Sequence, residues 1–148
     1  MCLKSLLSVF KGGYQAEPAK PAIQPCGTID INTASSILLD KLEEIGQGAA
    51  EIYLPDTDIK IYNKDEVVNS YELREVSLIP YIPEKFDCDD FAAELYGKFA
   101  GLVWSDVHAL NWFISEDNKF YFIEPQTRRL SPILDTWQGY KIRFFLGR

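Results

Sequence analysis

The sequence has a single histidine, few cysteines, no excess of basic residues and no long apolar run. Its 148 residues contain only three cysteines, and the net charge is −7. Three widely spaced cysteines form neither a disulfide framework nor a zinc-binding pattern. The acidic balance and the lack of a basic stripe predict that the chain does not bind nucleic acid. With no run of transmembrane length and no clear cleavage site near the start, we expect no membrane span and, by default, a cytoplasmic location.

Residues 1–27 are predicted to be a flexible N-terminal tail and linker, and residues 28–148 a single domain. The stretch GGYQAEPAKPAIQPC, residues 12–26, combines three prolines and two glycines with small residues, which is typical of a linker. The remainder is long enough for a hydrophobic core, because 47% of the whole chain is apolar and 14% is aromatic.

The hydrophobic pattern alternates between helical and strand periodicity along residues 28–148. Apolar residues at helical spacing predict a helix over 30–46, capped by Asn32 or Thr33, and another from Cys88 to about residue 99. A helix over 64–71 is followed by an irregular, proline-containing segment. Strands are predicted over 50–56, 58–63, 103–115, 119–126 and 139–147. This order indicates an α+β fold, with helices packed on one side of a small antiparallel sheet.

One cysteine stands at a predicted helix start in FDCDDFAAELYG, residues 86–97, and can be a nucleophile. Cys88 would gain thiolate character from the free N–H groups and the dipole of the helix. A helix leading away from Cys88 and a strand leading back bring His108 to the same level, where it can take the thiol proton. Glu124 would orient the imidazole, while Gln126 or the Cys88 backbone N–H could donate to an oxyanion.

The contact between His108 and Glu124 depends on the length of the turn at EDN, residues 116–118. A three-residue loop with Asn118 in the left-handed conformation pairs Ser115 with Lys119 and places Glu124 diagonal to His108. A two-residue Asp-Asn turn would place Glu124 on the opposite face of the sheet. The catalytic interpretation therefore requires a loop of odd length.

The aspartates around Cys88 admit two explanations. Asp87 can be the N-cap, and Asp89 and Asp90 lie in the first turn, where negative charge is favoured. The alternative is a calcium site formed by Asp87, Asp89 and Asp90, with Asn111 or Glu124 as a further ligand. No EF-hand spacing supports this site, so no cofactor is required. Cys88 also has an ordinary alternative as a small buried apolar residue, and His108 as a half-buried strand residue.

The pieces DCDDFA, HALNW and FIEPQT together resemble papain-like and transglutaminase-like cysteine peptidases. The resemblance is greatest to the protease domain of the fairy-ring mushroom agglutinin and its bacterial and phage relatives, and it covers about residues 50–130. It implies a papain-like fold, a triad of Cys88, His108 and Glu124, and calcium-dependent activity with acidic ligands beside the nucleophile. The interval between Cys88 and His108 is short for such a peptidase.

The leading hypothesis is therefore a cysteine peptidase or amidohydrolase that cleaves a peptide or amide substrate through a Cys88 thioester. One alternative is a non-enzymatic accessory or structural protein, of phage or bacterial origin, that keeps the fold. Another is a thiol transferase or deamidase with the same triad. Alkylation of Cys88 separates the active from the inactive hypotheses, since only an activated thiol should react faster than Cys2 and Cys26.

Overall fold

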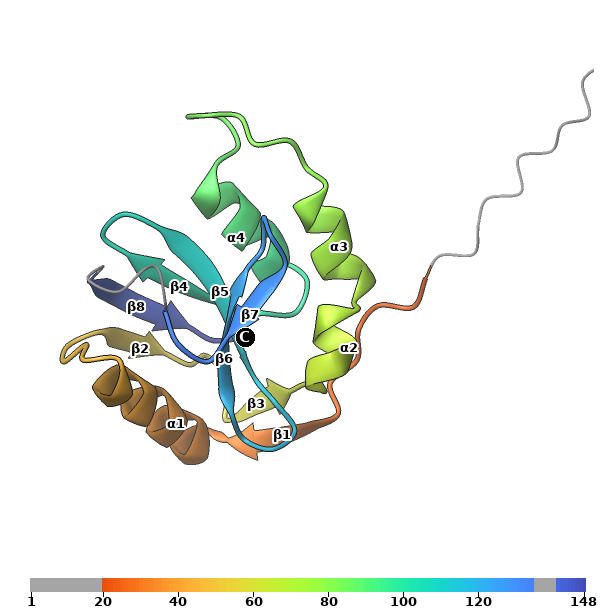
Figure 1. Cartoon of the computed structure of the whole chain (residues 1–148). Coiled ribbons are helices and arrows are strands. Elements are labelled where there is room, and N and C mark those ends of the chain that lie inside the picture. The colour runs from red at the N-terminus through yellow and green to blue at the C-terminus, as the bar shows by residue number, and fades with distance from the viewer. Residues whose placement is uncertain (1–19, 135–140) are drawn as a thin grey trace, which may run out of the picture.

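The computed structural model describes residues 20–134 and 141–148 of the chain. Residues 1–19, most of the predicted tail, lie outside the described part. Among the described residues, eight strands and four helices follow one another along the chain (Figure 1). No helix within these ranges is long and apolar enough to cross a membrane.

Six strands form the central sheet, in the order β2-β8-β4-β5-β6-β7. Their bounds are β2 Glu51–Tyr53, β4 Gly101–Ser105, β5 Ala109–Ile114, β6 Phe120–Glu124, β7 Arg129–Ser131 and β8 Ile142–Leu146. All neighbours are antiparallel except β2 and β8, which are parallel. Strands β1 (Gly27–Asp30) and β3 (Asp58–Ile61) form a separate two-stranded antiparallel sheet. The predicted antiparallel sheet is therefore present in β4 to β8, and the parallel strand β2 extends it at one edge.

Helix α1 (Ile31–Glu44) begins one residue after β1 and is capped by Asp30. The Asp30 carboxylate accepts hydrogen bonds from the backbone N–H groups of Asn32 and Thr33, both at 3.0 Å. The prediction that Asn32 or Thr33 is the N-cap was therefore wrong. These two residues lie in the first turn, and Asp30 accepts the hydrogen bonds of their free amides. The helix itself was correctly predicted, and it turns Leu38 and Leu42 into the core.

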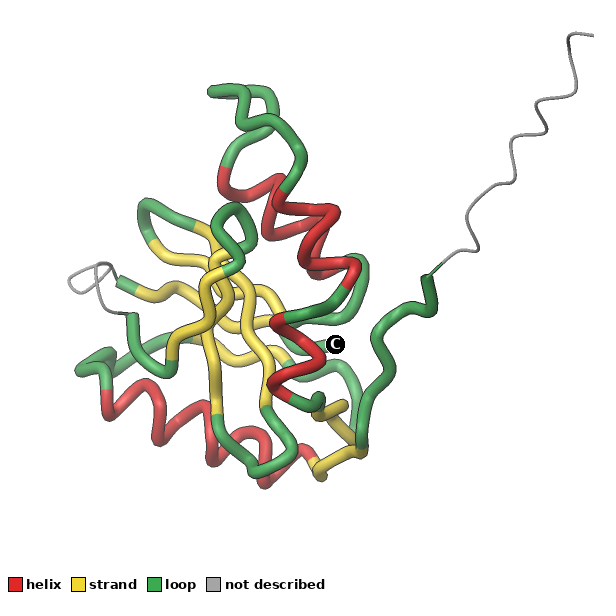
Figure 2. Tube along the Cα trace, turned by 45° about the vertical axis from the view of Figure 1, so that its right-hand side comes forward, coloured by secondary structure: helices red, strands yellow, loops and turns green. Residues whose placement is uncertain are grey.

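The sheet carries helices on both faces, which corrects the prediction of helices on one side only. Trp112 and its neighbour Phe113 point to opposite faces of β5, because successive strand residues alternate. Trp112 packs in the cluster that contains Leu38 and Leu42 of α1, whereas Phe113 packs with residues of α3 and α4. In Figures 1 and 2, α1 lies on one side of the strands and α2, α3 and α4 lie on the other. Every residue of β5 is buried, as expected for a strand covered on both faces.

The remaining helices are α2 (Lys64–Val68), α3 (Tyr71–Ser77) and α4 (Cys88–Tyr96). Helix α3 occupies a segment that was predicted to be irregular, and β7 a segment predicted to be a loop. The strand predicted over 103–115 is a hairpin, since β4 ends at Ser105 and β5 begins at Ala109. These elements give a fold of the α+β class, and no papain-like fold is shown.

Candidate functional site

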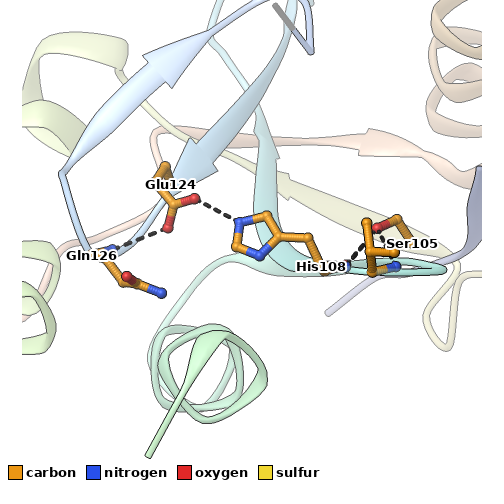
Figure 3. A network of polar contacts seen from close by, with 5 residues as sticks. Ser105, His108, Glu124 and Gln126 are labelled. Atoms are coloured by element: carbon orange, nitrogen blue, oxygen red, sulfur yellow. Dashed lines mark hydrogen bonds and ion pairs between the residues drawn. The ribbon is translucent and has the colours of Figure 1, made fainter. Parts of the chain in front are cut away.

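A tight turn joins β4 to β5 and fixes the position of His108. The Ser105 side chain accepts hydrogen bonds from the His108 N–H at 2.8 Å and the Val107 N–H at 3.3 Å, and its hydroxyl donates to the His108 carbonyl at 2.9 Å. The Ser105 N–H donates to the same carbonyl at 2.8 Å. This set of bonds leaves the His108 backbone little freedom at the entry to β5 (Figure 3). The Ser-Asp pair within WSDVH is a turn signal that the sequence interpretation missed.

The hairpin between β5 and β6 brings Glu124 to His108, as the three-residue loop predicted. The Ser115 N–H donates to the Lys119 carbonyl at 2.9 Å, and Asn118 has a φ of 59°. His108 Nε2 and Glu124 Oε2 are 2.7 Å apart, and their side chains are 18% and 9% exposed. The predicted register and the predicted contact are both confirmed. The contact shows that the two side chains can act together.

Gln126 completes this network through its backbone. Its N–H donates to Glu124 Oε1 at 3.3 Å, so both oxygens of the Glu124 carboxylate have donors on the protein. The two oxygens are fixed in direction, which restrains the plane of the carboxylate against the imidazole (Figure 3). The predicted role of the Gln126 side chain as an oxyanion donor stays a prediction.

Cys88 is the first residue of α4 and is half-buried. Asp87 is the N-cap, as predicted, and the Asp90 carboxylate accepts a hydrogen bond from the Asp87 N–H at 3.1 Å. Helix α4 packs against β4 and β5, and Figure 3 shows it beneath His108. Figure 1 shows the start of α4 and the turn between β4 and β5 toward the same side of the molecule. A direct contact of the Cys88 thiol with His108 stays a prediction.

Asn111 fastens α4 to the sheet. Its amide Nδ2 donates to the carbonyl oxygen of Ala92 at 2.8 Å and to that of Gly101 at 3.0 Å. The side chain is fully buried, and its Oδ1 has no hydrogen-bond partner among the described residues. The Nδ2 group of Asn111 thus holds α4 against the sheet, and its suggested role as a calcium ligand through Oδ1 stays a prediction.

The acidic cluster beside the thiol consists of Asp87, Cys88 and Asp89, whose ligand atoms lie within 4.8 Å of one another. Hydrogen bonding to the Asp87 carboxyl raises the pKa of Asp89, with smaller contributions from burial and from the neighbouring charges. Calcium prefers six to eight oxygen ligands. Two carboxylates and a sulfur meet this need poorly, and Asp90 is engaged in the helix cap. Any calcium bound here would take most of its ligands from water.

The fold is similar to that of solved structures. No protein-family description and no curated protein matches this chain. Among solved structures, the chain is similar to Polyporus squamosus lectin bound to the human-type influenza-binding epitope Neu5Acα2-6Galβ1-4GlcNAc, with 25% identity and a TM-score of 0.62. That match covers 80% of this chain and 49% of the lectin chain. A PSL1a-E64 complex matches at 25% identity with a TM-score of 0.64, over 80% of this chain and 51% of that one.

These matches correct the functional expectations. The solved structures are of a lectin, so the assignment to papain-like or transglutaminase-like cysteine peptidases, with its enzyme class and its peptide or amide substrate, is wrong. The accessory-protein and thiol transferase or deamidase alternatives, and the phage origin, find no support either. The resemblance rested on three short pieces of sequence, whereas the structural match extends over most of the chain. This chain shares its fold with about half the length of a lectin.

Proposed function

We propose that this chain is a carbohydrate-binding protein of the lectin type. The observation that carries the proposal is the likeness to Polyporus squamosus lectin over 80% of this chain, since that lectin was solved with a sialylated trisaccharide. Because this chain spans about half of the lectin chain, a sugar site must be sought among its own residues.

A cleft of about 560 Å³ between residues 20–24 and helices α2 and α3 offers such a site. Small-ligand sites in proteins occupy about 300 to 1,000 Å³. Tyr71 is 42% exposed and gives the cleft an aromatic wall, on which the apolar face of a sugar ring can lie. Lys20 and Arg74 also line the cleft, and the Lys20 ammonium lies 5.8 Å from the centroid of the Tyr71 ring. Two cations suit the carboxylate of a sialic acid.

Glu72 supplies an acceptor in the same cleft. The side chain is only 8% exposed, and its Oε1 accepts a hydrogen bond from the Ile23 N–H at 2.8 Å. Its Oε2 has no hydrogen-bond partner within the described ranges of the chain. A buried acceptor without a donor costs about 1 to 3 kcal/mol. When the carboxylate turns toward the cleft, a sugar hydroxyl can donate a hydrogen bond to Oε2 and remove that cost.

Isothermal titration calorimetry with Neu5Acα2-6Galβ1-4GlcNAc and with Galβ1-4GlcNAc tests the proposal. We expect the wild-type chain to bind both sugars, and Glu72→Gln, which keeps the acceptor for the Ile23 amide, to weaken both. Arg74→Ala should weaken only the sialylated sugar, by about tenfold if one charged hydrogen bond is lost. Arg143→Ala, an exposed arginine of β8, is the matched control. A wild-type chain that binds neither sugar would overturn the proposal, and equal binding by all variants would remove the cleft from it.

A second candidate function is the covalent capture of an electrophile at Cys88. It is favoured by the contact between His108 and Glu124 and by the position of Cys88 at the start of α4, which packs against β5. The electrophile taken as the probe is an epoxide. In this proposal the Cys88 sulfur attacks an epoxide carbon, the C–O bond breaks, and the alkoxide takes a proton from His108. The helix start favours the thiolate, and Glu124 stabilises the charged imidazole. Gln126 supports the site through its contact with Glu124.

Mass spectrometry after treatment with a small epoxide or with iodoacetamide tests this candidate. We expect Cys88 to be alkylated faster than the exposed Cys26, and the advantage to vanish in His108→Ala. Equal rates at the two cysteines would refute the reactive centre. The measurement is independent of sugar binding, so the two proposals stand or fall separately.

A further inference from the structure

The contacts of Asn111 identify a residue that positions α4 against the sheet. Its amide bridges Ala92 in the second turn of α4 and Gly101 at the start of β4, while Asn111 itself belongs to β5. One side chain thus joins the three elements that surround the candidate centre.

The bond to Ala92 adds little to the hydrogen bonding of the helix carbonyl. In an α-helix a carbonyl at the position of Ala92 already accepts from the amide four residues later. In exchange, the fully buried Oδ1 is left without a partner among the described residues. A buried polar atom without a partner costs free energy, whereas an apolar side chain of the same shape avoids that cost. An amide at this position therefore specifies geometry at some cost in stability.

The geometry that it specifies concerns Cys88 and His108. Cys88 lies one turn before Ala92 on the same face of α4, since residues four apart share a face. His108 lies three residues before Asn111, in the turn that leads into β5. An amide contact between Ala92 and Asn111 consequently fixes how far the helix start can slide relative to the imidazole.

We propose that Asn111 is a positioning residue that holds Cys88 in register with His108. The inference rests on the reactive centre proposed above. It predicts that an apolar replacement keeps the fold and loses the coupling, because α4 can then shift along β5. A residue with a purely structural role would affect stability and leave thiol chemistry alone.

The test compares Asn111→Leu with wild type in two measurements, the melting temperature and the pH dependence of Cys88 alkylation by iodoacetamide. We expect a melting temperature within a few degrees of wild type, and an alkylation rate at pH 7 that falls about tenfold, with a pH profile moved toward that of an unassisted thiol. Ile123→Val, which trims a buried side chain of β6 in the cluster shared with α4, is the matched control and should leave the profile unchanged. His108→Ala gives the profile expected for complete loss of coupling.

Each outcome decides something. A wild-type rate and profile in Asn111→Leu would overturn the inference while leaving the reactive centre intact. If wild-type Cys88 reacts no faster than Cys26, the centre fails and the inference fails with it. If Asn111→Leu does not fold, the claim that the amide is dispensable for stability is wrong. Asn111→Ser, which removes the bridge with a smaller change in polarity, then repeats the reactivity measurement.

Discussion

Replacing Gly101 by alanine tests how closely β4 packs on the core. Gly101 pairs with Trp112 of β5, and a Cβ at Gly101 would overlap the indole atoms Cε2 and Nε1 and lie 2.7 Å from Cζ2. The ring cannot withdraw freely. It is 2% exposed, its Nε1 donates to the Leu102 carbonyl at 3.0 Å, and it stacks on Phe120 with ring centroids 5.7 Å apart.

The expected loss follows from these contacts. Overpacking a dense core costs about 1 to 3 kcal/mol, and a buried indole N–H that loses its acceptor costs about 1 to 3 kcal/mol more. We therefore expect Gly101→Ala to reduce the free energy of unfolding by about 2 to 6 kcal/mol. A domain of this size has about 5 to 15 kcal/mol in total, so the melting temperature should fall by about 10 °C.

Urea and thermal unfolding measure the loss, and two further variants sharpen it. Gly48→Ala is the control, because a Cβ at Gly48 meets nothing within 4 Å, and it should change stability by less than about 1 kcal/mol. Trp112→Phe removes the atoms that clash, so in the Gly101→Ala background it should cost less than it does alone. A loss below about 1 kcal/mol for Gly101→Ala, or strict additivity of the two substitutions, would refute this account of the packing.

Three other perturbations test the candidate site. Ser105→Ala should cost about 1 to 3 kcal/mol and speed hydrogen exchange at the His108 amide, because the hydroxyl that accepts from that amide is lost. The pKa of Asp89 is raised in the folded protein, so the folded state binds the proton more tightly than the unfolded chain does. The contribution of Asp89 to stability is therefore present at low pH. It is lost as the pH rises above the ordinary range of an Asp carboxyl. Asp89→Asn should thus gain stability relative to wild type at pH 7 and not at pH 3, as urea titrations at both values will show. Millimolar calcium should raise the melting temperature by a few degrees at most, and Asp89→Asn should abolish the rise; an unchanged rise in the variant would place the ion elsewhere.

The contact between His108 and Glu124 could be predicted from the sequence because it depends on one local preference, that of Asn118 for the left-handed conformation. Asn118 tolerates a positive φ, which makes the loop three residues long, and the parity of a strand then decides which side chains share a face. The hairpin at Ser105 escaped prediction because WSDVH carries apolar residues on both sides of the turn, so its pattern continues that of a strand. Strand periodicity is informative about faces and much less so about where a buried strand ends.

The placement of helices on both faces was harder to predict for a related reason. The run NWFI contains three apolar residues and the buried Asn111. Its sequence therefore lacks the alternation of polar and apolar residues that would mark a strand buried on one face only. The distribution of α1 and α4 over the two faces depends on contacts distant in sequence. The same limit applies to function, because short motifs report local geometry, whereas the match to a lectin structure extends over 80% of this chain.

The first turn of α4 shows how electrostatics connects the parts of the candidate centre. The Asp89 carboxyl, hydrogen-bonded to Asp87, has a raised pKa, so this turn already resists a second full negative charge. A Cys88 thiolate would add another charge within 4.8 Å of both carboxylates. The helix dipole contributes about half an elementary charge and cannot offset all of this. A reactive Cys88 therefore requires positive charge beside it, and the reactive centre proposed above assigns that role to His108, which Ser105 and Glu124 hold in place. The same electrostatics make thiol reactivity depend on the position of α4, which is why the amide of Asn111 matters to the chemistry proposed for this centre.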